Sequence, residues 1–266
     1  MSGGTPLTGA AATADRAGSL LDGARLAISF LTVIPAGGSA SGTAWLSRAA
    51  PWFPVVGALV GGGAAGVVLL ADVAGLSHAV GGALALVFGI VVTRGLHEDG
   101  LADTADGLGV HGTRERRLAA MKDSAVGAHG ALAIACALLL GALALAALDA
   151  GHAARALVAA HVLSRTAMVV VAAALPNARA HEGLGRSLAV SPVVALLATV
   201  PSVVGVLAVC GVADGTLTLG VAALTTLAAL AIQHRAFGGR TGDTLGATGK
   251  LVEVAALVAL SGAWAS

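Results

Sequence analysis

The chain has 266 residues, of which 57% are hydrophobic and only 11% are charged, and its mean hydropathy is +0.90. This composition excludes an ordinary soluble domain, in which about a quarter of the residues are charged. The formal net charge is +1 and no basic stretch contains interleaved aromatic residues, so we expect no nucleic-acid partner. Composition therefore predicts an all-α, polytopic integral membrane helical bundle in a lipid bilayer.

The first residues differ from the rest of the chain. Residues 1–18 are small and polar, include Asp15 and Arg16, and lack the apolar centre of a signal peptide. We expect residues 1–19 to be a disordered tail and residues 20–266 to be a single membrane-embedded domain, because no repeat or linker divides them. The segment from Leu20 to Pro35 is apolar but short and ends at a proline, which favours a re-entrant or interfacial helix.

Seven further apolar stretches come close to the roughly 20 helical residues that a bilayer core of about 30 Å requires. They are 52–74, 78–96, 128–148, 153–175, 191–211, 216–232 and 246–264. The first stretch contains overlapping GxxxG spacings, which would allow another helix to approach closely. The glycines concerned are Gly57, Gly61, Gly62 and Gly66. The sequence thus predicts about seven transmembrane helices besides the short N-terminal one.

The connections between these stretches carry an uneven charge. Alternation across the membrane places four long connections on one side and three short links on the other. The long connections are 36–51, 97–127, 176–190 and 233–245, and the short links are 75–77, 149–152 and 212–215. Every Lys and Arg in these segments belongs to the long connections, which the positive-inside rule assigns to the cytoplasm. Motifs far apart in sequence would then share one cytoplasmic face and could form a composite site.

An acidic segment, HEDGLADTADGLG, follows the second apolar stretch directly. Its residues Asp99, Asp103 and Asp106 are spaced i, i+4 and i+7, so a helix would place all three on one face, where their charges repel. A divalent cation such as Mg²⁺ would relieve this repulsion, because it prefers carboxylate oxygens completed by water and substrate phosphate. The alternative is a solvated acidic turn in which an aspartate caps a helix.

Three neighbours of these aspartates are less informative. Glu98 lies about 100° away on the helix and could support the ligands indirectly. His97 and His111 flank the acids, but no HExxH spacing is present, so we expect solvated or hydrogen-bonding histidines and no zinc site.

Charged residues also occur farther along the chain. Lys122 and Asp123 follow a cluster of arginines that could hold a polyanionic substrate or anchor the chain at anionic lipid. Arg165 and Glu253 lie inside apolar stretches, where charges are costly, so they could pair with each other or point into a common polar cavity.

A glycine-rich segment, GGRTGDTLGATGK, contains Arg240, Asp243 and Lys250. It does not form a Walker A motif, because Leu251 follows the lysine. A backbone with so many glycines could nevertheless approach phosphate closely.

Three motifs occur in the order HEDGLADTADGLG, MKDSAVGAHG and GGRTGDTLGA, and they resemble those of cobalamin synthase, the adenosylcobinamide-GDP ribazoletransferase family. The resemblance covers about residues 20–260 and includes the shorter segments SR, at 164–165, and EGLG, at 182–185. It implies a magnesium-dependent enzyme of the bacterial cell membrane whose catalytic loops face the cytoplasm. Such an enzyme joins adenosylcobinamide-GDP to α-ribazole or α-ribazole 5′-phosphate and releases GMP. The family usually has leucine in place of Glu98, so we do not expect Glu98 to be an essential ligand.

The resemblance and the residues together suggest roles for individual side chains. Asp99, Asp103 and Asp106 would hold Mg²⁺, while Asp243 completes the metal site or acts as base, with Asp106 as a second catalytic candidate. The candidates for substrate binding are Lys122, Asp123, Arg165, Arg240, Lys250 and Glu253. A homo-oligomer is compatible with the sequence, which does not specify the number of subunits.

Two other functions compete with this interpretation. A CDP-alcohol phosphotransferase also holds metal with aspartates on membrane helices, but its DG, AR, GxxxDxxxD pattern is missing, since Asp99-Gly100 leads to Leu101-Ala102-Asp103. A cation-coupled transporter would carry its charges near the membrane midplane within broken helices.

Overall fold

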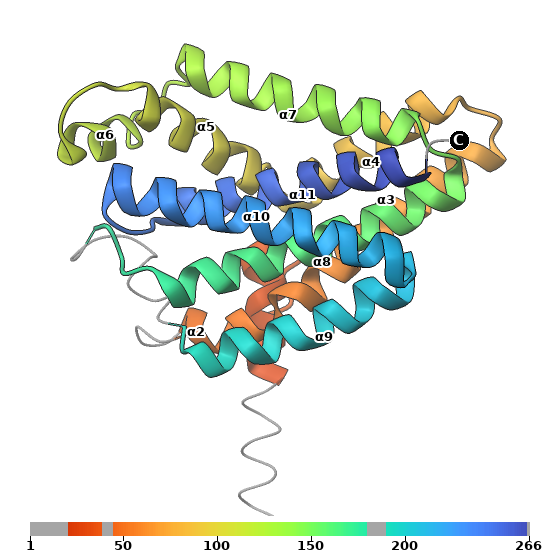
Figure 1. Cartoon of the computed structure of the whole chain (residues 1–266), viewed down its shortest axis with the longest axis horizontal. Helices are drawn as coiled ribbons and strands as arrows, with labels where there is room; N and C mark the ends of the chain where they lie inside the picture. Colours follow the sequence, from red (N-terminus) through yellow and green to blue (C-terminus); the bar gives the residue numbers. More distant parts are fainter. Residues whose placement is uncertain (1–20, 39–44, 180–189, 265–266) are drawn as a thin grey trace, which may run out of the picture.

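The computed structural model describes residues 21–38, 45–179 and 190–264, and these residues form an all-helical bundle (Figure 1). The tail and the EGLG segment lie outside this part of the chain. After a helix at residues 21–31, the elements are α2 Trp45–Ala49, η1 Ala50–Trp52, α3 Phe53–Val73, α4 His78–Thr93, α5 Leu96–Gly109, α6 Arg114–Ala120, α7 Ala128–Ala146, α8 Ala150–Ala174, α9 Pro192–Cys210, α10 Val212–Phe237 and α11 Gly242–Trp264. In the described residues the β pairing is limited to one isolated bridge between Asn177 and Arg240.

Six segments of the described chain are long and apolar enough to cross a membrane by themselves. They are Ser47–Val73, Ala128–Ala146, Ala150–Ala174, Pro192–Cys210, Val212–Phe237 and Gly242–Trp264. The pair α4 and α5 passes the same test only together, and the two helices are bent by 87°. The seven predicted stretches therefore correspond to helices, and 216–232 and 246–264 each begin four residues too late because their first turns are polar or glycine-rich.

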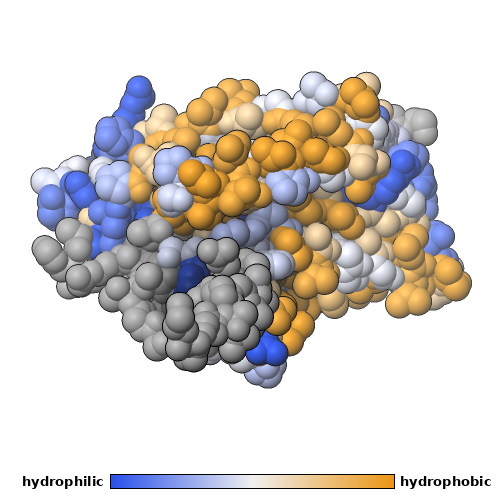
Figure 2. Space-filling view, turned by 90° about the horizontal axis from the view of Figure 1, so that it is seen from below, coloured by the Kyte–Doolittle hydropathy of each residue, from blue (hydrophilic) through white to orange (hydrophobic). Residues whose placement is uncertain are grey.

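The surface agrees with a membrane location. Figure 2 shows hydrophobic side chains in a broad band across the middle of the visible face, with hydrophilic residues gathered at both ends. Exposed leucines and valines on α3, α7, α9 and α10 contribute to the apolar surface. Such exposed hydrocarbon is unfavourable in water but matches the acyl chains of a bilayer.

Helix α8 is the centre of the bundle, because 78% of its most apolar 18-residue stretch is buried inside the protein. Helices α3, α9 and α11 pack around it (Figure 1). Its many alanines, including the buried Ala153, Ala156 and Ala160, allow neighbouring backbones to approach closely.

Two of the four glycines in the predicted GxxxG spacings explain the contact between α3 and α8. A Cβ atom on Gly57 would lie 2.4 Å from the His161 carbonyl oxygen, and one on Gly61 would lie 2.8 Å from that of Leu157. The close approach is thus confirmed for this face. The expectation of a close approach is wrong for Gly62 and Gly66, which are turned away from α8. A Cβ atom added at either position would meet no atom within 4 Å.

The sharp turn between α4 and α5 ends the second predicted span before residue 96. Arg94 and Gly95 both have left-handed backbone angles, with φ of 56° and 65°. Such angles terminate a helix, and they are unfavourable for a residue other than glycine. The Arg94 side chain donates a hydrogen bond of 3.2 Å to the Thr32 carbonyl oxygen, which ties the turn to the end of the first helix.

The N-terminal segment forms a short helix, one side of which packs against the rest of the protein. Residues 21–31 would be only about 16 Å long, too short to cross a bilayer. Leu26, Ala27 and Leu31 are buried in the same apolar cluster as Phe53 and Met168. The short helix is therefore packed against the bundle, and this contact brings it beside the start of α3.

We predict that Gly57→Ala destabilises the protein while Gly66→Ala does not. The first change forces a methyl group into the α8 backbone, and overpacking of this kind costs about 1–3 kcal/mol. The second places a methyl group in open space and favours the helix slightly. Thermal unfolding in detergent measures the difference, and equal melting temperatures for the two variants would contradict the assigned contact.

Candidate active site

The acidic segment forms helix α5, as its spacing predicts. Asp99 is exposed and Asp103 is half-buried. Neither carboxylate has a hydrogen bond or ion pair within the described residues. The charges of Asp243, Asp99 and Asp106 all act on Asp103 and the charge of Arg179 opposes them only in part, so the acidic face is a concentrated region of negative charge.

Asp106 has a different environment from the other two. Its carboxylate accepts hydrogen bonds of 2.7 Å from the Gly127 backbone N–H and 2.8 Å from that of Gly130. These groups lie in the first turn of α7, where unpaired N–H groups favour a negative charge. A Cβ atom on either glycine would lie 2.5 Å from an Asp106 oxygen. Asp106 therefore holds α5 against α7, and its roles as metal ligand and base stay predictions.

Asp243 lies in the first turn of α11. Thr241 caps this helix, because its Oγ1 accepts a hydrogen bond from the Thr244 N–H while Thr244 Oγ1 accepts one from the Thr241 N–H. Thr241 Oγ1 also donates to Asp243 Oδ2 at 3.3 Å, and Arg179 Nη1 lies 3.6 Å from the same oxygen. Two groups thus fix the orientation of the Asp243 side chain.

The motifs on α5 and α11 meet, as the shared-face prediction requires. A Cβ atom on Gly100 would lie 2.5 Å from the Asp243 carbonyl oxygen, so α5 can approach α11 only because residue 100 is glycine. Asp99 and Asp243 line the same cavity of about 90 Å³. The part of the glycine-rich segment from Gly242 onward is helix and not loop.

The side chains of the described residues do not by themselves form a complete metal site. The described residues contain no group of three His, Cys, Asp or Glu side chains close enough to hold a metal ion. Mg²⁺ needs fewer protein ligands, since one or two carboxylates together with water and substrate phosphate are its usual set. The unpaired Asp99 and Asp103 fit that requirement.

Arg165 and Glu253 pair with each other, which was one of the two alternatives. Arg165 Nη1 lies 3.0 Å from Glu253 Oε2, and His161 Nδ1 lies 2.9 Å from the same oxygen. Lys250 Nζ lies 2.8 Å from Glu253 Oε1 and 2.9 Å from Glu98 Oε1. We call these five side chains, from α5, α8 and α11, the buried charge cluster.

The buried charge cluster is closed and nearly dry. With neutral His161, its two cations and two carboxylates balance, as a site inside a membrane requires. The small cavity that it lines has a volume of about 10 Å³. Arg165, Lys250 and Glu253 are each no more than 3% exposed. In this arrangement they join helices, and none of them lines the cavity beside Asp99 and Asp243.

The remaining predicted substrate-binding residues lie nearer the surface or at a helix end. Lys122 and Asp123 are exposed in the turn after α6, where Asp123 Oδ1 accepts a hydrogen bond from the Ala125 N–H. Arg240 Nε donates to the carbonyl oxygens of Ala172 and Leu175 at the end of α8. Burial lowers the pKa of the Arg240 guanidinium below its usual value.

Three site features were not predicted. Arg179 contacts Asp243, but its sequence neighbourhood contains only the general signal of a positively charged connection. His161 and Ser164 contact Arg165, and only their spacing on one helix face could have indicated them. His97 is buried, which excludes the solvated alternative, and its Nε2 has no hydrogen-bond partner in the described residues.

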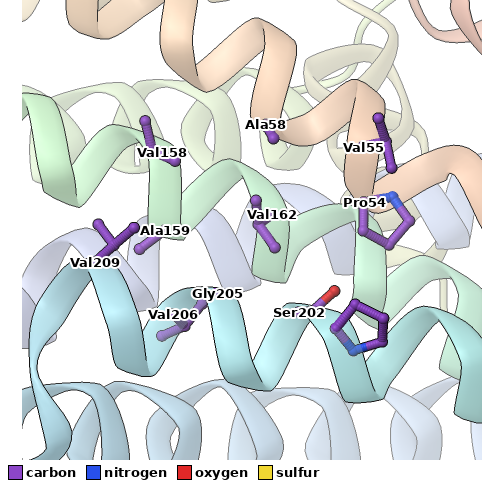
Figure 3. Close-up of a pocket in the computed structure, with 11 residues that line it drawn as sticks. Pro54, Val55, Ala58, Val158, Ala159, Val162, Ser202, Gly205, Val206 and Val209 are labelled. Carbon is purple, nitrogen blue, oxygen red and sulfur yellow. The ribbon is translucent and has the colours of Figure 1, made fainter.

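The larger cavities lie elsewhere and are apolar. Figure 3 shows one of about 270 Å³ between α3, α8 and α9, into which Val158, Val162 and Val206 project and where Ser202 is the labelled hydroxyl. Another, of about 390 Å³, lies between α8, α9 and α10. Neither cavity contains a charged side chain, so neither provides groups for transferring a charged substituent.

The sequence profile described as cobalamin-5-phosphate synthase matches residues 23–261. The chain belongs to the cobalamin-5-phosphate synthase family. Curated relatives carry the name adenosylcobinamide-GDP ribazoletransferase. The one from Desulforamulus reducens is 40% identical over 230 residues, covering 86% of this chain and 92% of its own. Those from Azorhizobium caulinodans and Leptothrix cholodnii are 36% and 40% identical over 250 and 252 residues, covering 87% and 90% of this chain and 92% and 95% of their own. No solved structure matches the chain.

We predict that Lys250→Met is strongly destabilising and that Glu98→Leu partly rescues it. The single change leaves the cluster with an unbalanced buried carboxylate, which costs about 3–5 kcal/mol. The double change removes one cation and one carboxylate and leaves the pair of Arg165 with Glu253. Thermal unfolding of the wild type, both single variants and the double variant measures the coupling. A double variant as unstable as the sum of the two single changes would show that Glu98 and Lys250 act independently.

Proposed function

We propose that the protein joins adenosylcobinamide-GDP to α-ribazole, or to α-ribazole 5′-phosphate, and releases GMP. The observation that carries the proposal is the pair of unpaired carboxylates, Asp99 and Asp103, beside a cavity that Asp243 also lines. Membership of the family and the printed names of the relatives support the same reaction. Neither the family membership nor the names of the relatives support a CDP-alcohol phosphotransferase.

We propose Mg²⁺ as the cofactor, held by Asp99 and Asp103 together with the diphosphate of the substrate. A divalent ion would neutralise charge that the described protein residues leave unbalanced on α5. When bound, it supplies charge neutralisation and orientation of the phosphates. Asp106 is the remaining candidate ligand, although both its oxygens already accept backbone hydrogen bonds.

We propose that the protein's own residues contribute in two ways: they accept a proton, and they align the reacting groups. A ribose hydroxyl of the ribazole forms a bond to the phosphorus attached to cobinamide, while the bond from that phosphorus to the GMP oxygen breaks. The hydroxyl proton passes to Asp243, whose carboxylate is oriented by Thr241 and Arg179. GMP leaves with the bonding electrons. Alignment of this kind is the main contribution that a protein makes to phosphoryl transfer.

The cationic residues divide into two groups in this proposal. Lys122 and Asp123 are exposed at the end of the bundle that carries α6 and are the candidates to position the phosphates and the nucleotide, with Arg240, which is buried beside the end of α8, as a further candidate. Arg165, Lys250 and Glu253 act from inside by keeping α5 and α11 together. A transporter would need charged side chains that can bind a solute and release it again. In the buried charge cluster these side chains are paired with one another, which disfavours a transporter.

We also propose that α5, α6 and the start of α11 face the cytoplasm, where nucleotide substrates are made. The links at the opposite end, 74–77 and 147–149, contain no Lys or Arg. Under the positive-inside rule, the end carrying Arg114, Arg116 and Arg117 is cytoplasmic.

We predict that Asp103→Asn leaves a folded membrane protein and lowers the rate of GMP release by about 100-fold or more, since a metal site contributes several kcal/mol to such a transfer. GMP release by purified protein from both substrates, titrated with Mg²⁺, measures the effect, and Glu115→Gln on α6 is the matched control at an exposed acidic residue of the same end. A near-normal rate of Asp103→Asn at limiting Mg²⁺ would disprove the ligand role. No GMP release by the wild type, beside an active relative as positive control, would favour a carrier.

The orientation predicts how single cysteines react. In a variant without Cys136 and Cys210, Glu115→Cys on α6 should react with a membrane-impermeant maleimide only after the cells are opened. Leu76→Cys, exposed in the link between α3 and α4, should react in intact cells. The reverse pattern would invert the proposed topology.

A further inference from the structure

The cavity beside Asp99 and Asp243 has two chemically different ends. Phe53, Met168 and Leu245 are almost fully buried and form an apolar floor. Asp99 and Gly242 are exposed and Asp243 is half-buried, so they form the rim. Among the described residues that line the cavity, the only hydrogen-bonding side chains are the two carboxylates at the rim.

The floor is also aromatic. Phe30, from the helix at residues 21–31, stacks on Phe53 with ring centroids 6.0 Å apart and an interplanar angle of 21°. The Met168 thioether adds a soft and polarisable surface, which favours contact with aromatic rings. Such a floor suits a flat, uncharged ring that needs no hydrogen bonds at its inner edge.

We infer that this cavity is the subsite for the benzimidazole base of the ribazole substrate, an inference that rests on the proposed function. The two substrates together offer four ring systems: adenine, guanine, the corrin and a benzimidazole. Adenine and guanine carry donors and acceptors on their edges, and burying these unpaired against Phe53, Met168 and Leu245 is unfavourable. The corrin is far larger than the cavity, and the edge of a cobinamide corrin carries polar amide side chains that the apolar floor would leave unpaired. Only the benzimidazole has an edge made of carbon alone.

The dimensions determine how the base enters. The cavity measures about 90 Å³. A cavity of about 150 Å³ is known to accept benzene, so this smaller one admits only the outer carbon edge of the benzo ring and not a whole ring. The imidazole half and the attached ribose then remain at the rim, beside Asp99 and Asp243. This pose brings a ribose hydroxyl to the carboxylate that the proposed mechanism requires as proton acceptor.

The inference makes Met168 a determinant of base specificity. Met168→Phe fills the floor and should raise the KM for α-ribazole about tenfold, because pockets discriminate a few carbon atoms by about 10- to 200-fold. The KM for adenosylcobinamide-GDP should change less than about twofold. Val203→Phe, in the apolar cavity between α8, α9 and α10, is the matched control and should change neither KM.

Enlarging the floor gives a second test that does not depend on a bulky substitution. Met168→Ala should shift kcat/KM by about tenfold towards the riboside of a naphthimidazole, which has one more ring, relative to α-ribazole. Calorimetric titration of α-ribazole into each purified variant gives a measure of binding that needs no turnover.

The outcomes separate this inference from the proposed function. If the wild type releases GMP but Met168 variants change the KM for both substrates equally, or leave base preference unaltered, the subsite is wrong and the function stands. If the wild type binds α-ribazole and Met168→Phe abolishes that binding without any GMP release being observed, the subsite stands and the function is wrong. Normal binding of α-ribazole by folded Met168→Phe overturns the inference.

Discussion

The carboxylate of Glu253 is the interaction on which the bundle depends. It receives Lys250 on one oxygen and Arg165 and His161 on the other, and Lys250 extends the contact to Glu98. An isolated charge in the apolar interior of a membrane protein is costly, so these side chains are stable only together. Because they come from α5, α8 and α11, their pairing fixes the three helices relative to one another.

The neighbouring packing makes that pairing geometrically feasible. Gly246 and Gly249 on α11 face α5 and α8, where an added Cβ would come within 3.1 Å of the Leu96 carbonyl oxygen or of the Ser164 hydroxyl. The glycines therefore determine how closely the three helices approach one another, and the ion pairs determine how the helices are aligned along their axes. Glu98 and Asp99 are adjacent in sequence, yet one belongs to the buried cluster and the other lines the open cavity, so α5 holds acidic side chains in two different environments.

Much of this fold follows from local signals in the sequence. Hydropathy predicted the spans, the i, i+4, i+7 spacing predicted helix α5, and the cost of buried charge made the pair of Arg165 and Glu253 one of two open alternatives. The sequence did not reveal the 87° turn, because its cause is a left-handed Arg94 that a distant carbonyl group holds in place. It also could not indicate that Asp106 caps α7, since that bond joins groups more than twenty residues apart. The roles of the aspartates in catalysis stay predictions.

The position of Glu253 on α11 has a consequence for biosynthesis. This helix follows the other described helices in sequence, so Glu98 and Arg165 belong to segments that are synthesised earlier. Until α11 leaves the ribosome and enters the bilayer, Arg165 lacks Glu253 and Glu98 lacks Lys250. Neither the charged core nor the cavity wall that contains Asp243 exists before that moment. A chain that ends before Lys250 therefore leaves the charges of Glu98 and Arg165 without the partners that offset their cost inside the membrane.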